Sequence, residues 1–373
     1  MTRQGPEDST LVTGFPSYTA KRMVLKLLTA DPKERVFVLV RDKYATDAEE
    51  FAETLPVTQR KRMSVMVGDV SSMDLGLSGK EYRTLVAELT NIHHMAAHLH
   101  MGARREAIQQ VNVGGTRGVL ELALECRRLR RFNFWSTSHV AGDREGMIME
   151  DELACGQGFR NNYEHSKYAA EKIVRSMSRR VPSTVFRPSI IVGDSKTGEI
   201  DRFDGPYHLM VLIVDSPLDV PLPLPAGGSA PLHLVPVDYV VEAGYVLSRA
   251  DDAISKTFHL VDPCPLSARS VYQLVAERAH RKPVAHGSIP AGIARALLKL
   301  PGMARLGSGS RSVLDGLTRN VFYNCRNTLE ALRHTEVWCP PFETYVDNLV
   351  RYVKDVRAAR RRRLDEEVAD PLD

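Results

Sequence analysis

The chain has 373 residues, of which 43% are hydrophobic and 26% are charged. This length fits about two domains, or one large α/β domain with an additional part, and the composition is that of a globular protein rather than a disordered or fibrous one. The formal net charge of +4 is small for this size and is spread along the chain, so it does not by itself argue for nucleic-acid binding, and we expect no nucleic-acid partner.

The cysteines and the apolar runs bear on the cellular location of the protein. Without any C-x-x-C pair, the scattered cysteines predict reduced thiols in the cytoplasm, and neither a disulfide framework nor a zinc site. The N-terminus lacks the apolar run of a signal peptide, and no segment of about 18 apolar residues is present, so we expect no membrane span. The five cysteines are Cys126, Cys155, Cys264, Cys325 and Cys339.

Strands and helices are predicted to alternate through the first half of the chain. Residues 10–13 form a short apolar strand, and residues 20–30 carry apolar side chains at helical spacing. Further buried strands are expected within residues 35–42, 62–70, 88–98 and 130–142, with helical stretches such as residues 112–128 between them. This alternation predicts an α/β fold with a doubly wound, parallel, Rossmann-type sheet.

After residue 194 the sequence becomes rich in proline and glycine, and later helical segments such as 266–281 and 290–306 lie outside the alternation. We therefore expect a smaller, mostly helical C-terminal cap. The predicted segments are a Rossmann core (1–193), loops on the substrate side (194–232), a return to the core (233–262), the cap (263–357) and a charged tail (358–373).

The stretch after the first strand lies where a dinucleotide-binding loop belongs, yet Gly14 is its single glycine. In such a loop the second glycine lets the backbone approach the pyrophosphate and the third lets the helix pack on the strand; Ser17 and Ala20 occupy these positions. A positive φ at Ser17 would cost about 1 kcal/mol, although its amide and hydroxyl can still donate to a phosphate. The loop alone leaves a plain strand-to-helix turn open.

Two later strand ends carry candidate cofactor contacts. Arg41, with Lys43 close by, follows the second strand, where an arginine accommodates the 2′-phosphate of NADP. This favours NADPH, and a solvated arginine is the alternative. Asp69 follows the third strand, where a carboxylate can meet the adenine amine; a turn-capping aspartate is the alternative.

The motif with the clearest chemistry is Tyr163-x-x-x-Lys167, which begins 26 residues after Thr137. On a helix, side chains four residues apart share a face, so the phenol and the ammonium project together. A nearby ammonium favours the phenolate and is expected to bring the proton transfer of Tyr163 nearer to neutral pH.

With these motifs the sequence resembles the extended short-chain dehydrogenase/reductases, from about residue 10 to residue 262. Within them it is most similar to the thioester reductases and fatty acyl-CoA reductases, which are related to the reductase domains of carboxylic acid reductases. The stretches that carry the likeness are LVTGF, LVRDK, GDVSSMDLGLS, HHMAAHLH, VNVGGTRGVLELA, STSHVAGD, YEHSKYAAE, FRPSIIVGDSKTGEI and HLVPVDYV.

The resemblance implies a role for each matching residue. Thr137 is the hydroxyl that binds the substrate carbonyl, with Ser136 and Ser138 as alternatives, and Tyr163 is the general acid. Lys167 binds the nicotinamide ribose and tunes the tyrosine. Asn112 is structural and links neighbouring strands. The implied cofactor-binding residues are Gly14, Ser17, Tyr18, Arg41, Lys43, Asp69, Val70, Ala96, Ala97, Tyr163, Lys167, Pro188 and Ser189.

The resemblance also implies a function: NADPH-dependent reduction of an acyl thioester or an aldehyde, with a small, CoA-bound or carrier-bound acyl substrate. An NADP-dependent alcohol, hydroxysteroid or sugar dehydrogenase is one alternative. A cofactor-binding module whose turnover is impaired by the altered glycine loop is another.

Two remaining patterns received a weaker functional interpretation. His94 and His98 have the spacing of metal ligands on a helix, but without a helix or a partner carboxylate we predict no metal site. Residues 292–300 form a basic amphipathic segment that would suit a membrane surface, although most such helices cover a core. The sequence leaves the oligomeric state open.

Overall fold

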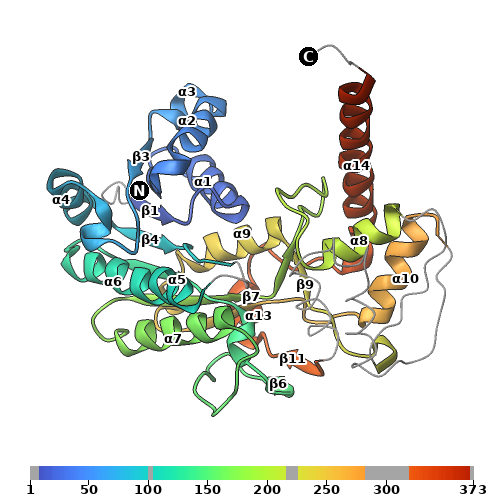
Figure 1. Ribbon diagram of the computed structural model, residues 1–373. Helices are drawn as coiled ribbons and strands as arrows, with labels where there is room; N and C mark the ends of the chain where they lie inside the picture. The colour runs from blue at the N-terminus through green and yellow to red at the C-terminus, as the bar shows by residue number, and fades with distance from the viewer. Residues whose placement is uncertain (1–7, 100–103, 216–225, 282–318, 370–373) are drawn as a thin grey trace. The chain divides into compact units, whose positions relative to one another are not determined.

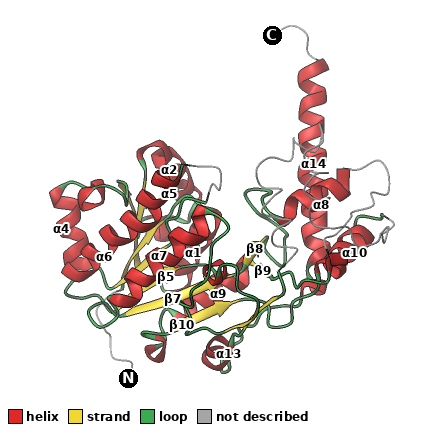
Figure 2. Cartoon of the chain, turned by 60° about the horizontal axis from the view of Figure 1, so that its bottom comes forward, coloured by secondary structure: helices red, strands yellow, loops and turns green. Residues whose placement is uncertain are grey.

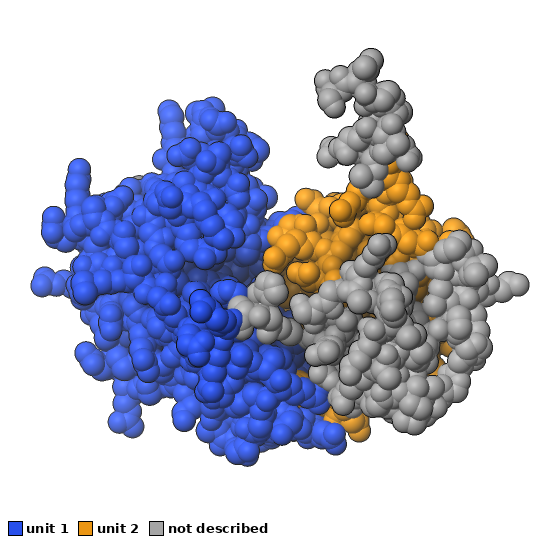
Figure 3. Space-filling view, in the orientation of Figure 1, with its two compact units in different colours: residues 1–189, 240–261, 323–338 blue, residues 190–239, 262–322, 339–373 orange. Residues whose placement is uncertain are grey.

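A computed structural model describes residues 8–99, 104–215, 226–281 and 319–369 (Figure 1). The chain divides into two compact units. Unit 1 comprises residues 1–189, 240–261 and 323–338, and unit 2 comprises residues 190–239, 262–322 and 339–373 (Figure 3).

Unit 1 is built on a parallel sheet, drawn in yellow in Figure 2. The sheet has seven strands in the order β10-β7-β5-β4-β1-β2-β3. The strands predicted from the apolar runs are confirmed, and most of their residues are buried, as expected for strands covered on both faces. The strands are β1 (Ser9–Thr13), β2 (Arg35–Val40), β3 (Met63–Val67), β4 (Asn91–His94), β5 (Arg131–Trp135), β7 (Ser183–Pro188) and β10 (Thr257–Leu260).

Helices connect these strands and cover the sheet (Figure 1). They are α1 (Tyr18–Ala30), α2 (Ala45–Thr54), α3 (Val57–Arg60), α4 (Gly79–Glu88), α5 (Arg105–Gln109), α6 (Gly115–Glu125), α7 (Asn162–Ser176) and α13 (Arg326–Leu332), with α9 (Val237–Leu247) leading back into the unit. A π-helical turn over Gln110–Gly114 joins α5 to α6.

The two faces of the sheet can be told apart at β5. Phe134 and Trp135 are neighbours in this strand, so their side chains point to opposite faces. The Phe134 ring lies 4.5 Å from the Lys167 amine of α7. The Trp135 ring packs so closely on Gly244 of α9 that a Cβ there would lie 2.5 Å from it. Helices α7 and α9 therefore cover opposite faces, as in a doubly wound sheet.

The strand order places a switch point between β1 and β4. From β1 the chain moves outward through β2 and β3, and then returns to the other side of β1 to form β4. In open parallel sheets, ligands bind at the carboxyl ends of the strands beside such a point. We therefore expect the predicted site residues at the edge of the sheet formed by the carboxyl ends of the strands.

Unit 2 has its own core, formed by α8 (Pro206–Asp215), α10 (Ala268–Arg278), α14 (Val346–Ala369) and the parallel pair β8 (Ile190–Val192) and β9 (Leu234–Pro236). Helix α10 lies within the predicted segment 266–281. Helix α14 continues through Arg360–Arg363, which the sequence analysis placed in a tail, because arginine, leucine and glutamate favour helices and the next proline is Pro371. Segment 290–306 lies outside the described residues.

Residues 323–338 were expected in the cap and instead belong to unit 1. The buried Glu150 carboxylate, which follows the short strand β6 (Gly146–Ile148), holds them: it accepts hydrogen bonds from the Asn327 amide at 2.6 Å and from the Thr328 hydroxyl at 3.0 Å. The Asn324 amide also donates to the carbonyl of Ile148 at 2.9 Å. The remaining short strand, β11, spans Val321–Tyr323.

Candidate active site

The three predicted catalytic side chains come from the end of β5 and the first turns of α7. Thr137 follows β5 by two residues, and Tyr163 and Lys167 lie one turn apart in α7. Asn161 caps this helix by accepting a hydrogen bond from the Glu164 amide at 2.9 Å. The Thr137 side chain hydrogen-bonds the Tyr163 phenol. The structure thus joins the hydroxyl and the phenol that the resemblance assigned to the substrate carbonyl.

Lys167 is buried, with only 2% of its surface exposed. Its ammonium donates a hydrogen bond to the carbonyl of Trp135 at 2.6 Å and lies 4.5 Å from the centre of the Phe134 ring. Burial lowers the pKa of Lys167 to about 8, and the negative charge of Glu171 acts against that shift. The ammonium is therefore expected to lose its proton only slightly above neutral pH.

Tyr163 is half-buried, and burial raises its pKa to about 12, while the hydrogen bond with Thr137 acts in the opposite direction. The sequence predicted that Lys167 would bring this pKa towards neutrality. That prediction is wrong for this arrangement, because the effect of burial on the pKa of Tyr163 dominates and the Lys167 ammonium donates its hydrogen bond to the carbonyl of Trp135. Tyr163 therefore keeps its proton at neutral pH, which is the form that a proton donor needs.

Two buried charged residues beside this group were given no role by the sequence analysis. Glu171 lies one turn beyond Lys167 in α7, and Arg187 lies near the end of β7. The Arg187 guanidinium donates to the Glu171 carboxylate at 2.7 Å, and both side chains are at most 1% exposed. The spacing of four residues from Lys167 was the signal that could have pointed to Glu171.

The loop after β1 meets the loop after β4 at the switch point. Gly14 has a φ of +89°, and a Cβ there would lie 2.7 Å from the Ala96 amide nitrogen and from the carbonyl carbon of Met95. The Thr13 hydroxyl accepts hydrogen bonds from the Met95 and Ala96 amides at 3.2 and 3.1 Å. Glycine is required at position 14 by both its conformation and this close approach. Ala97, the next residue of the second loop, is half-buried.

Ser17 precedes α1 with a φ of −56°, so the strain that a positive φ would have caused does not arise. Its side chain is exposed, whereas Ala20 is fully buried where α1 packs on the sheet. The first turn of α1, which begins at the half-buried Tyr18, contains no acidic residue. The amides of a first helical turn lack intrahelical partners, and the helix dipole favours an anion there, so this end of α1 fits a pyrophosphate.

Arg41 and Lys43 lie exposed at the end of β2, around one aromatic ring. The Arg41 guanidinium is 5.2 Å and the Lys43 amine 4.6 Å from the centre of the Tyr44 ring. A hydrogen bond with Lys43 and the charges of both cations lower the pKa of the Tyr44 phenol against the effect of burial. Two cations at this strand end fit a phosphate group. Tyr44 was not among the residues predicted from the sequence.

The predicted adenine contacts follow β3. One oxygen of the Asp69 carboxylate accepts hydrogen bonds from the amide and the hydroxyl of Ser71, at 2.8 and 2.6 Å, which is the turn-capping alternative. Val70 is buried against α6, where a Cβ on Gly115 would lie 2.6 Å from its side chain. A role for Asp69 or Val70 in contacting adenine stays a prediction.

Pro188 ends β7, and the Ser189 amide donates to the carbonyl of Leu260 at 3.2 Å. The buried hydroxyls of Ser189 and Ser138 have no hydrogen-bond partner among the described residues. Buried hydroxyls are normally satisfied, so these two atoms fit a site that a bound molecule completes. They follow β7 and β5, which are neighbours in the sheet.

Asn112 has the structural role expected of it, but it joins a loop to a helix rather than two neighbouring strands. Its side-chain oxygen accepts a hydrogen bond from the His98 amide at 2.6 Å, and its side-chain nitrogen donates to the Ser166 hydroxyl at 2.8 Å. Asn112 thereby connects the loop after β4 to α7, the helix that carries Tyr163.

His93 and His94 belong to strand β4, whereas His98 lies in the loop that follows it. His94 is hydrogen-bonded between the hydroxyls of Thr13 and Thr116, at 2.9 and 3.0 Å, and His93 accepts a hydrogen bond from the Trp135 indole at 3.2 Å. Burial lowers the pKa of both imidazoles to about 3. Within the part of the chain that is described, no group of three or more histidine, cysteine or acidic residues could hold a metal ion.

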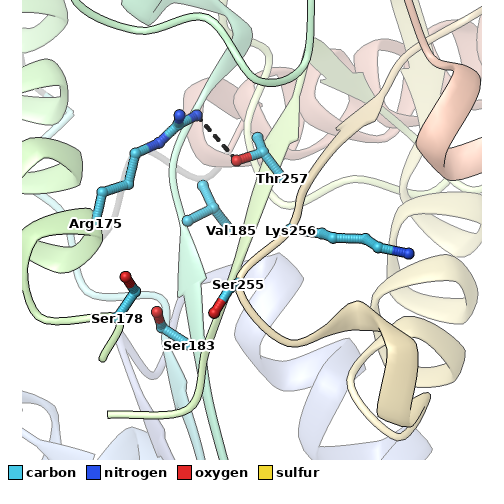
Figure 4. A pocket seen from close by; sticks show the side chains of 7 residues that line it. All are labelled: Arg175, Ser178, Ser183, Val185, Ser255, Lys256 and Thr257. Carbon is cyan, nitrogen blue, oxygen red and sulfur yellow. Dashed lines mark hydrogen bonds between the residues drawn. The ribbon is translucent and has the colours of Figure 1, made fainter. Parts of the chain in front are cut away.

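A polar cavity of about 210 Å³ lies at the other edge of unit 1, beside the amino ends of β7 and β10. In Figure 4 Arg175 reaches across it to the Thr257 hydroxyl, at 2.9 Å. None of the predicted site residues lines it, so we do not assign the site to this cavity. Its lining residues are Arg175, Ser178, Ser183, Val185, Ser255, Lys256 and Thr257.

Across the described ranges, no helix is both long enough and apolar enough to cross a bilayer. The cytoplasmic location expected from the cysteines stays a prediction. The amphipathic segment 292–300, considered for membrane contact, lies outside the described residues.

The fold and the residues at its switch point define an oxidoreductase of the extended short-chain dehydrogenase/reductase type, which uses a nicotinamide cofactor. Residues 12–244 match a family of NAD-binding proteins described as male sterility protein. The chain belongs to this family.

Two relatives match about two thirds of the chain. A linear gramicidin synthase component from Brevibacillus parabrevis is 27% identical over 67% of this chain, but the match covers 5% of that protein. Fatty acyl-CoA reductase wat of Drosophila melanogaster is 26% identical over 62% of this chain and 52% of its own length. The chain thus spans about half or less of the length of these relatives.

Among solved structures, the terminal R domain from the myxalamid PKS-NRPS biosynthetic pathway superposes with a TM-score of 0.81. It is 26% identical, and the match covers 95% of this chain and 92% of that domain. The likeness therefore extends beyond the sheet to nearly the whole chain.

Proposed function

We propose that the chain is an NADPH-dependent reductase that acts on an acyl thioester or on the corresponding aldehyde. The observation that carries this proposal is the hydrogen-bonded pair of Thr137 and Tyr163, one helical turn from the buried Lys167 amine. Together these groups supply a hydroxyl for a carbonyl oxygen, a proton donor and a cation, which are the groups that carbonyl reduction requires.

The names of the relatives support a thioester as the substrate. One is a fatty acyl-CoA reductase, and another belongs to linear gramicidin synthase. We therefore propose that the acyl group arrives bound to CoA or to a carrier protein, which would be the partner of this chain.

When bound, the cofactor supplies a hydride to the carbonyl carbon of the substrate. Thr137 donates a hydrogen bond to the carbonyl oxygen and stabilises the negative charge that develops there. Tyr163 gives its phenolic proton to the same oxygen. With a thioester the product is a hemithioacetal; its C–S bond breaks, the thiol leaves with the hydroxyl proton, and an aldehyde remains. A second reduction would give the alcohol.

The predicted cofactor residues divide by the part of the dinucleotide that they would hold. Gly14, Ser17 and Tyr18 would hold the pyrophosphate at the start of α1, and Arg41 with Lys43 would bind the 2′-phosphate, which is the reason to propose NADPH. The adenine side would be lined by Asp69, Val70, Ala96 and Ala97, and the nicotinamide side by Lys167, Pro188 and Ser189.

Two titrations and one substrate panel test the proposal. Calorimetry with NADPH and with NADH is expected to give at least about tenfold tighter binding of NADPH, since charge-assisted contacts to a phosphate are worth about 1.5–3 kcal/mol. Incubation with NADPH and a panel of acyl-CoA esters, aldehydes, ketosteroids and sugars is expected to oxidise NADPH with the first two classes. Failure to bind either cofactor would sink the reductase proposal, and turnover of ketosteroids or sugars alone would favour the dehydrogenase alternative.

A further inference from the structure

One buried carboxylate in α7 contacts two of the chain segments that border the predicted site. Glu171 is fully buried, and its Oε2 accepts a hydrogen bond from the Ser136 hydroxyl at 2.6 Å. The Arg187 guanidinium donates to the same carboxylate through Nε at 3.1 Å and through Nη2 at 2.7 Å. Ser136 follows β5 and Arg187 belongs to β7, so a single side chain joins α7 to two strands.

Each of these contacts is next to a predicted site residue. Ser136 directly precedes Thr137, and Arg187 directly precedes Pro188. Lys167, one turn before Glu171, donates to the carbonyl of Trp135 at 2.6 Å. Helix α7 therefore holds two consecutive residues at the end of β5: Lys167 binds Trp135, and Glu171 binds Ser136. Thr137 is the next residue in the chain.

Charged and titratable groups of α7, β7 and β10 surround Glu171. Arg175 of α7 donates a hydrogen bond to the Glu171 carboxylate at 3.0 Å, and Lys167 lies one helical turn before Glu171 in the same helix. Behind Arg187, the His259 imidazole of β10 lies 3.1 Å from Nη1, and the carbonyl of Glu152 accepts a hydrogen bond from Nη2 at 2.7 Å. The positive charges of the two arginines hold the pKa of Glu171 below its usual range against the opposing effect of burial.

Stability alone does not account for such a group, because well-packed apolar residues often stabilise a core as much as a buried ion pair does. The ion pair also fixes geometry, because each of its hydrogen bonds holds one donor and one acceptor atom in a defined relative position. We propose that Glu171 is a positioning residue for the reduction: by holding Ser136 it sets the Thr137 hydroxyl against Tyr163 and Lys167 of α7. This inference rests on the proposed function.

Glu171 also acts on Lys167 through its charge. Burial lowers the pKa of Lys167 to about 8, and the Glu171 carboxylate raises it. If the carboxylate becomes neutral, the Lys167 pKa falls further, so the ammonium is lost at a lower pH. A role in packing alone would leave this titration unchanged.

The test uses two site variants, the conservative variant Ser136→Thr and one matched control in the full chain. Glu171→Gln removes the charge, and Ser136→Ala removes the hydroxyl that Glu171 holds. Glu150→Gln is the control, because Glu150 is also a buried acid of unit 1 but accepts its hydrogen bonds from Asn327, Thr328 and the backbone amide of His259. For each variant kcat and KM are measured against pH with a long-chain acyl-CoA and an aliphatic aldehyde at saturating NADPH, and the NADPH Kd is measured by fluorescence.

We expect kcat to fall about 100-fold in Glu171→Gln, the scale of a 1 Å misplacement, and about tenfold in Ser136→Ala. The NADPH Kd is expected to stay near that of the wild type in both. In Glu171→Gln the alkaline fall of kcat is expected to begin at a lower pH than in the wild type. Ser136→Thr, which restores a hydroxyl, is expected to recover most of the rate, and Glu150→Gln is expected to change the melting temperature only.

The inference is overturned if Glu171→Gln and Ser136→Ala behave like Glu150→Gln, with lower melting temperatures but an unchanged kcat and pH profile. If Glu171→Gln fails to fold, Ser136→Ala decides by itself, because it removes one hydroxyl. A wild type that reduces none of the substrates would defeat the proposed function and the inference together. An active wild type with unaffected variants would defeat the inference alone.

Discussion

The proposed cofactor end and the proposed catalytic end of unit 1, called the cofactor end and the catalytic end below, differ in how their residues are held. At the cofactor end, beside β1, β2 and β4, the fixed feature is the backbone at Gly14, and the side chains of Ser17, Arg41 and Lys43 are exposed. At the catalytic end, Lys167, Glu171 and Arg187 are at most 2% exposed. Arg187 donates a hydrogen bond to Glu171 at 2.7 Å, and Lys167 donates one to the carbonyl of Trp135 at 2.6 Å.

This difference explains why the glycine loop can depart from the usual pattern. A site made by backbone shape and solvent-screened charge loses little when one side chain changes. A buried charge whose partner is removed stays buried without compensation, at a cost of about 3–5 kcal/mol. The catalytic end is therefore expected to be sensitive to substitution and the cofactor loop to be tolerant, except at Gly14.

The largest effect is expected for Tyr163→Phe, which removes the proposed proton donor. General acid catalysis contributes a factor of about 10²–10⁴, so kcat should fall by that amount while the NADPH Kd changes little. Single-turnover rates with an aldehyde and saturating NADPH measure this effect. Tyr168→Phe in the same helix is the control, and equal losses in both variants would remove Tyr163 from its proposed role.

Arg187→Met tests the expected sensitivity of the buried catalytic end to substitution. It leaves the Glu171 carboxylate buried with Arg175 as its remaining cationic hydrogen-bond partner, so the free energy of unfolding should fall by about 3–5 kcal/mol in urea titrations. The matched control is Arg326→Ala, which breaks a solvent-exposed pair with Glu330 and should leave the free energy of unfolding nearly unchanged. Similar losses in the two variants would contradict the contrast between the regions.

Gly14→Val tests the exception at the cofactor end. A Cβ at this position would meet backbone atoms of Met95 and Ala96 at 2.7 Å, in a conformation that side chains rarely adopt. We expect NADPH binding to weaken by at least about tenfold, because strain of about 1–3 kcal/mol would move the two loops apart. Gly114→Ala, in a helical turn where a Cβ meets nothing within 4 Å, should bind normally; unchanged binding in Gly14→Val would exclude the proposed loop contact.

Arg41→Ala tests the proposed choice of NADPH. Removing one charge-assisted contact at an exposed site should weaken NADPH binding by about 1 kcal/mol, or roughly fivefold, and leave NADH binding unchanged. Calorimetry in low salt and in high salt measures the binding of both cofactors. The loss of NADPH affinity in Arg41→Ala relative to the wild type should shrink as the salt concentration rises. Arg60→Ala, which changes another exposed arginine, serves as the control. An equal loss for both cofactors would show that Arg41 does not select the phosphate.

The smallest effect is expected for Ser17→Gly. Because the φ of Ser17 is −56°, a glycine relieves no strain at this position. The binding free energy of NADPH should therefore change by less than about 1 kcal/mol. Tenfold tighter binding in this variant would instead revive the interpretation that Ser17 obstructs the pyrophosphate.

The sequence determined the features that depend on neighbours along the chain. The apolar runs at residues 35–42 and 62–70 predicted strands, because burial on both faces requires continuous apolar side chains. The spacing of Tyr163 and Lys167 predicted a shared helical face, since positions four apart are neighbours on any α-helix. Together with the family resemblance, these local patterns gave the fold class and the candidate catalytic residues.

Tertiary structure alone decided where the charges lie. Nothing local indicates that the Lys167 ammonium donates to the carbonyl of Trp135, 32 residues away, or that Glu171 of α7 pairs with Arg187 of β7. For the same reason the shift of the Tyr163 pKa was predicted with the wrong sign, because a pKa depends on burial and on the atoms that surround the group in space. Periodicity records which face of an element is buried, and the partners on that face are set only when the elements pack.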